Sequence, residues 1–110
     1  AMRFPHVQGG FRDILVVEER QAVKVAAGVS AAMAAFAEPL SVCLHAAKRA
    51  GPLLGKRVLV TGSGPIGILA VVAAKAAGAA EIVATDVVDG TLPTALTMGA
   101  TATINTMAQP

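Results

Sequence analysis

The sequence has 110 residues, of which 55% are hydrophobic, 15% charged and only 3% aromatic. This length allows one small domain, and the apolar share excludes an intrinsically disordered chain. The formal net charge is +2, but the basic residues are scattered and form no run with interleaved aromatics, which argues against nucleic-acid binding.

The first elements expected are two short strands, because residues 12–19 and 21–25 are β-branched and apolar. Ser30 can cap a helix over 31–37, and Pro39 suits the first turn of a second helix that runs to about Ala50. The remaining expected elements are strands over 58–61, 81–85 and 101–105, helices over 66–77 and 92–98, and a frayed end at 109–110.

From residue 58 onward the expected order is β-α-β-α-β, which is typical of a parallel sheet. Three such strands form the first half of a doubly wound sheet, so the chain has the pattern of an incomplete domain. The stretch 58–74 contains no charged residue, and a membrane span is the alternative interpretation. Gly62, Gly64, Pro65 and Gly67 interrupt it, which favours a strand, a turn and a buried helix and no membrane association.

The compartment is indicated by cysteine usage and by the N-terminus. Cys43 is the only cysteine, which excludes an intrachain disulfide and a cysteine-based structural zinc site within this chain. No apolar run follows Arg3, so we expect no signal peptide. Both features suit a cytoplasmic protein.

The motif that carries chemistry is Gly62-Ser63-Gly64-Pro65-Ile66-Gly67, a G-x-G-x-x-G between an expected strand and an expected helix. Gly62 permits the tight turn, Gly64 lets a pyrophosphate approach the backbone, and Gly67 lets the helix pack close to the strand. The helix N-terminus would offer unpaired N–H groups to the phosphates. The six residues are therefore candidate dinucleotide-binding residues.

Asp86 follows Gly62 by 24 residues and ends the second expected strand, where an acid can accept hydrogen bonds from the adenosine ribose. No Lys or Arg occurs between Val83 and Met98, and Asp89 adds a second acid. This disfavours a 2′-phosphate and points to NAD over NADP. The alternative interpretation is a glycine-rich turn with an acid that caps the next helix.

The segments AMRFPHVQGGF, FAEPLSVCLHAAKRAG and GKRVLVTGSGPIG resemble the sorbitol-dehydrogenase-like branch of the zinc-dependent medium-chain dehydrogenases. The resemblance covers almost the whole chain and fades after about Asn105. It implies that residues 1–27 are the end of a GroES-like catalytic domain, that 28–50 are connecting helices, and that 51–110 are a partial Rossmann domain. It also implies that most of the catalytic domain and the other zinc ligands lie outside this sequence.

The resemblance further implies that Glu38 matches the family's acid beside the catalytic zinc, as a ligand or a hydrogen-bond partner of its water. The alternative is an acid in the first turn of a helix, stabilised by the helix dipole. His45 more simply packs or caps at a domain junction, Cys43 is a small buried residue, and His6 has no role that local sequence defines.

The activity implied by the resemblance is zinc-assisted oxidation of a sugar acid, L-idonate, at C5, with hydride transfer to NAD. Sorbitol or another polyol is the alternative substrate, and the intact enzyme would be a homo-oligomer. Two other classes stay open. One is a non-catalytic module that senses a nucleotide, and the other is a methyltransferase that uses S-adenosylmethionine, although the glycine spacing favours a dinucleotide.

Overall fold

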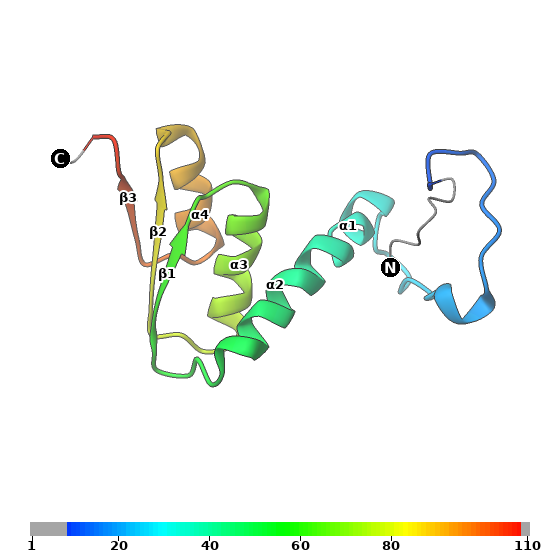
Figure 1. Cartoon of the computed structure of the whole chain (residues 1–110), viewed down its shortest axis with the longest axis horizontal. Helices are drawn as coiled ribbons and strands as arrows, with labels where there is room; N and C mark the ends of the chain where they lie inside the picture. The colour runs from blue at the N-terminus through cyan, green and yellow to red at the C-terminus, as the bar shows by residue number, and fades with distance from the viewer. Residues whose placement is uncertain (1–8, 109–110) are drawn as a thin grey trace.

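The computed structural model describes residues 9–108, so the expectations for 1–8, including His6, and for 109–110 lie outside the described residues. An α/β body is formed by the chain after about Ser30, and the segment 9–29 extends away from it (Figure 1). None of the helices in the described part of the chain is both long enough and apolar enough to cross a membrane.

The segment 9–29 does not form the strands expected at 12–19 and 21–25, and that prediction is wrong in this structure. Its regular structure is one short 3-10 helix, η1 (Glu19–Gln21). Ile14 and Val16 are 82% and 91% exposed. A strand requires a neighbour that pairs with its backbone and covers its apolar side chains, and among the described residues no strand lies beside this segment.

Two consecutive helices, α1 (Ala31–Ala35) and α2 (Ala37–Ala50), lead into the sheet. The predicted cap is confirmed, because the Ser30 hydroxyl accepts a hydrogen bond of 3.2 Å from the Met33 N–H. Pro39 lies in the first turn of α2 as predicted, and Gly51 ends the helix with φ +88°. The first helix is shorter than expected because Phe36 forms a turn between α1 and α2.

The body contains a three-stranded parallel sheet in the order β1-β2-β3, as the alternating pattern predicted. Its strands are β1 (Arg57–Thr61), β2 (Glu81–Asp86) and β3 (Ala102–Asn105). Thr61 pairs with Thr85, and Asp86 pairs with Asn105. All three carboxyl ends therefore lie at one edge of the sheet, where ligands bind in open α/β folds.

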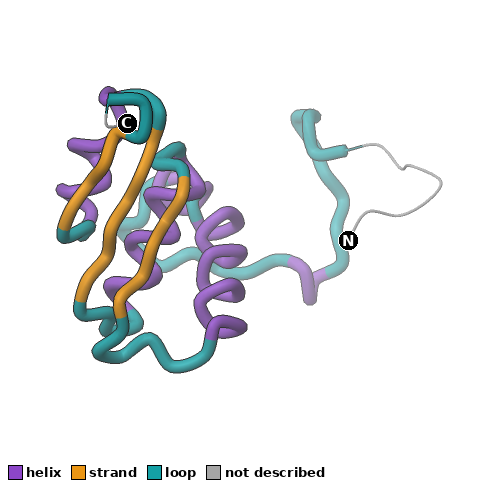
Figure 2. The backbone as a smooth tube through the Cα atoms, turned by 60° about the vertical axis from the view of Figure 1, so that its left-hand side comes forward, coloured by secondary structure: helices purple, strands orange, loops and turns teal. Residues whose placement is uncertain are grey.

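Helices α3 (Pro65–Ala76) and α4 (Leu92–Met98) pack on each other and on the sheet, with the 3-10 helix η2 (Asp89–Thr91) before α4. Figure 2 shows the strands side by side with helices behind them. The buried core is aliphatic and rich in alanine, as the composition indicates. It consists of Val71, Ala74, Ile82, Ala84, Ala95 and Ala100. Leu59 lies 63% exposed in the middle of β1.

Candidate functional site

The chain leaves β1 through a tight turn at Gly62, whose φ is +87°. Side chains other than glycine rarely adopt this backbone conformation. The Gly62 N–H donates to the Thr85 carbonyl over 2.8 Å, which ties the turn to β2. The predicted role of Gly62 in the turn is therefore confirmed.

Gly67 lies where α3 passes closest to this turn. A Cβ at Gly67 would lie 1.8 Å from the Gly62 carbonyl oxygen and 3.7 Å from Val60 Cγ1. The first contact is with backbone, which cannot move aside as a flexible side chain can. The close packing of helix on strand predicted for Gly67 is confirmed, and any side chain there would separate α3 from β1.

Gly64, unlike Gly67, has open space beside its Cα, because a Cβ added there would meet no atom within 4 Å. Its φ of −68° and ψ of −176° are accessible to any residue. The backbone therefore does not require glycine at this position. Gly64 instead borders an open groove of about 470 Å³ between the ends of β1 and α3, lined also by Thr61, Ile66 and Ala70.

The N-terminus of α3 has no side-chain cap. Gly64 is the N-cap residue and Pro65 occupies the first turn, as predicted. The first backbone hydrogen bond of α3 runs from the Ile68 N–H to the carbonyl of the N-cap residue Gly64, at 2.9 Å. The N–H groups of Ile66 and Gly67 precede it and have no acceptor within the helix. Together with the helix dipole, they form a surface suited to a phosphate.

Ser63 is fully buried, and its polar groups bond within the fold. Its N–H donates to Asp86 Oδ2 over 2.7 Å, and its hydroxyl donates to the Thr85 carbonyl over 3.3 Å. Ser63 therefore fastens the glycine loop to the end of β2. Sequence reasoning placed Ser63 in the loop but did not predict its hydrogen bonds to Asp86 and Thr85.

Asp86 is half-buried at the carboxyl end of β2, as predicted, and both of its oxygens accept hydrogen bonds. Oδ2 accepts from the Ser63 N–H at 2.7 Å and from the Thr91 hydroxyl at 3.4 Å. Oδ1 accepts from the N–H groups of Val87 and Val88 at 2.7 and 3.2 Å. These donors, that of Ser63 foremost, stabilise the carboxylate and lower the pKa of Asp86 below its ordinary value of 3.8.

Asn105 at the end of β3 and Thr106 just after it contact the side chain of Asp89 and the backbone of Asp86. The Thr106 N–H donates to the Asp86 carbonyl over 2.9 Å, and Asn105 Nδ2 donates to Asp89 Oδ1 over 2.7 Å. Sequence reasoning did not predict the hydrogen bonds that Thr91 donates to Asp86 and Asn105 donates to Asp89. The available signal for Asn105 was a polar residue at the end of the third parallel strand, which must lie beside Asp86.

Glu38 is the residue that the resemblance places beside the catalytic zinc. Glu38 lies exposed in the first turn of α2, where its carbonyl accepts a 2.6 Å hydrogen bond from the Ser41 hydroxyl. His45 is exposed on the same helix, whereas Cys43 is buried and its thiol donates to the Ile66 carbonyl over 3.4 Å. Among residues 9–108, no three His, Cys, Asp or Glu side chains cluster as a metal site.

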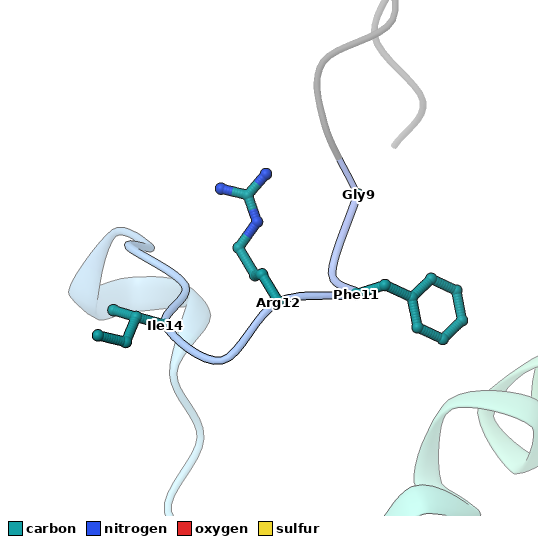
Figure 3. Close-up of a pocket in the computed structure, with 4 residues that line it drawn as sticks. All are labelled: Gly9, Phe11, Arg12 and Ile14. Carbon is teal, nitrogen blue, oxygen red and sulfur yellow. The ribbon is translucent and has the colours of Figure 1, made fainter.

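A separate concavity of about 540 Å³ lies in the N-terminal segment, lined by Gly9, Phe11, Arg12 and Ile14. Figure 3 shows that the side chains of Phe11, Arg12 and Ile14 point in different directions. They do not converge on a common point, as the groups of a binding site do. The glycine loop remains the better candidate site.

No protein-family model matches the chain. It is, however, 50% identical to L-idonate 5-dehydrogenase (NAD(P)(+)) of Escherichia coli K12 over 105 residues, which are 96% of this chain and 31% of that protein. It is 56% identical to the sorbitol dehydrogenase of Gallus gallus over 70 residues, 64% of this chain and 20% of that protein. The chain thus spans about a third or less of these relatives.

Solved structures agree with these relationships. The crystal structure of Escherichia coli L-idonate 5-dehydrogenase matches with a TM-score of 0.92 at 48% identity, covering 100% of this chain and 32% of that one. A dehydrogenase of Sinorhizobium meliloti bound to NADP matches with a TM-score of 0.87 at 34% identity, covering 94% and 30%. An alcohol dehydrogenase of Escherichia coli CFT073 complexed with NADH also gives 0.87, at 30% identity, covering 96% and 32%. The expected α/β Rossmann-type segment is confirmed, and the chain belongs to the zinc-dependent medium-chain dehydrogenases.

Proposed function

We propose that the 62–67 loop and Asp86 bind the adenosine diphosphate half of a nicotinamide dinucleotide. The observation that carries this proposal is Gly64, which faces an open groove at the uncapped end of α3 although its backbone would accept a side chain. A pyrophosphate that approached Gly64 would meet the N–H groups of Ile66 and Gly67. Ser63 and Pro65 shape the loop, and Asp86 would receive the ribose hydroxyls.

The proposed cofactor is NAD, with NADP bound less well. Asp86 is ionised over the physiological range, and the N–H of Ser63 and further donors favour that form by lowering its pKa. An ionised carboxylate accepts hydrogen bonds from a ribose diol and repels a 2′-phosphate. One structural relative is bound to NADP and another to NADH, so this preference requires measurement in this protein.

The proposed reaction of the whole enzyme is the oxidation of L-idonate at C5 to 5-keto-gluconate, with hydride transfer to NAD. Its support is the 50% identity with an L-idonate 5-dehydrogenase over nearly the whole chain. Oxidation of sorbitol or another polyol is the alternative, supported by 56% identity with a sorbitol dehydrogenase over a shorter region. We further propose a cytoplasmic homo-oligomer, in keeping with the lone cysteine and this substrate class.

Zinc belongs to the proposed whole enzyme, in which it would supply a Lewis acid for the alcohol oxygen. Glu38 is the one residue that we propose near it. Support comes from the match of Ala37-Glu38-Pro39-Leu40 to the family's acid, and from the exposure of the Glu38 side chain in the first turn of α2. The proposed division of the chain at residues 27 and 50 follows the same match.

Gly64→Ala in the full-length protein tests cofactor binding. The added methyl group meets no protein atom within 4 Å, so we expect the thermal midpoint of unfolding to stay unchanged. The same methyl group would stand where the pyrophosphate approaches, and we expect at least a tenfold weaker affinity for NADH, about 1.4 kcal/mol. Titration of NADH fluorescence measures this affinity.

Gly10→Ala is the matched control, because Gly10 also has open space around its Cβ but lies outside the glycine loop and the loop that follows β2. It should change neither stability nor affinity. If Gly64→Ala binds NADH like the wild type, the proposed position of the pyrophosphate is wrong. A wild-type protein that binds S-adenosylmethionine and no dinucleotide would favour the methyltransferase class.

A further inference from the structure

Asn105 makes two hydrogen bonds that define its orientation. Its Nδ2 donates to Asp89 Oδ1 over 2.7 Å, and its Oδ1 accepts from the Met107 N–H over 2.9 Å. Exchanging the amide nitrogen and oxygen would set oxygen against a carboxylate and nitrogen against an N–H donor, so both bonds would be lost. The side chain therefore links the end of β3 to the loop that follows β2.

That loop folds around the carboxylate of Asp86. The N–H groups of Val87 and Val88 and the hydroxyl of Thr91 all donate to it. Asp89 stands within the same turn, three residues after Asp86. Asp86 in turn pairs with Asn105 across the sheet. The Asn105 amide thus holds a second acid in the turn that surrounds the proposed ribose acceptor.

We propose that Asn105 is a specificity-determining positioning residue, which holds the Asp89 carboxylate at the rim of the ribose site and so disfavours dinucleotides with a 2′-phosphate. This inference rests on the proposed function, because it assumes that Asp86 faces the ribose. Asn105 itself touches no reacting atom and acts through Asp89.

The physical reason is electrostatic. Asp89 is exposed, so without a partner its side chain would turn toward solvent and its charge would be screened. A neutral amide holds the carboxylate in place without cancelling its charge, whereas Lys or Arg would cancel it. No Lys or Arg occurs between Val83 and Met98. A held, uncompensated charge repels the doubly negative 2′-phosphate and leaves a neutral ribose hydroxyl unaffected.

The experiment measures dissociation constants of NADH and NADPH for the full-length protein by nicotinamide fluorescence. We expect the wild type to prefer NADH, and Asn105→Ala to raise the relative affinity for NADPH about three- to tenfold, with NADH affinity nearly unchanged. Asp89→Asn should raise the relative affinity for NADPH at least as much. The double variant should match Asp89→Asn alone, because Asn105 acts only through that carboxylate.

Ile104→Ala is the control for a loosened β3, since it removes a side chain from the same strand without touching Asp89. It should lower the thermal midpoint and leave the cofactor ratio unchanged. The inference is overturned if Asn105→Ala or Asp89→Asn keeps the wild-type ratio, or if the double variant is additive. A wild type that binds neither NADH nor NADPH would overturn the proposed function as well. A wild type that binds NADH, with a cofactor ratio that the variants do not change, would overturn only the role of Asn105.

Discussion

At the residue scale, Asp86 connects stability to the proposed site, because its carboxylate accepts a hydrogen bond from the glycine loop and three from its own loop. These donors, Ser63 first, lower its pKa in the folded state. A lowered pKa contributes stability that is present above the ordinary carboxyl pKa and is lost as the pH falls through the folded value. Over the neutral range the acid stays ionised.

This predicts how Asp86→Asn should behave as the pH changes. Its thermal midpoint should lie below that of the wild type at pH values above the ordinary carboxyl pKa of 3.8, and the difference should shrink as the pH falls below it and the wild-type carboxylate becomes protonated. Thermal unfolding of both proteins across this range provides the measurement. Asp89→Asn is the control, since no donor of the glycine loop reaches that acid. A difference that stays constant with pH would contradict the prediction.

At the element scale, the parallel strands and their helices were predictable because each has a local signal in the sequence. Pro65 and Gly64 mark the start of α3, and Gly99 with φ +125° marks the end of α4. The strands expected at 12–25 failed because β-branched composition describes a side chain's preference, not the presence of a partner strand. Likewise, the orientation of Ser63 and the Asn105–Asp89 bond depend on which strand ends lie side by side. Local patterns do not contain that information.

Replacing Glu38 tests whether this acid belongs to a metal centre or only stabilises the first turn of α2. In the full-length protein, Glu38→Ala should reduce zinc retention or turnover by about 10- to 100-fold, the usual effect of removing a residue that supports a metal. A helix-end acid would instead change only stability, by about 0.3–1 kcal/mol. Zinc content per protomer and kcat distinguish these results. Glu81→Ala, which removes an exposed acid from the start of β2, is the control and should change neither quantity.

At the scale of the whole molecule, the described residues include the groove at which we propose that half of a dinucleotide binds, and they contain no cluster of metal ligands. Escherichia coli L-idonate 5-dehydrogenase, of which the chain covers 31%, is about three times as long. Under the proposed function, cofactor binding and the chemical step draw on different parts of the enzyme. The first would use the loop at residues 62–67, while the second needs groups to polarise the alcohol and to hold the nicotinamide.

This separation predicts that the pure 110-residue chain forms no NADH from L-idonate, with or without added zinc. Metal polarisation of the alcohol and correct placement of the two reactants each lower a barrier by several kcal/mol. The described residues contain no cluster of metal ligands. Escherichia coli L-idonate 5-dehydrogenase, assayed under the same conditions, is the positive control. NADH formation by the chain that a zinc chelator abolishes would contradict the prediction.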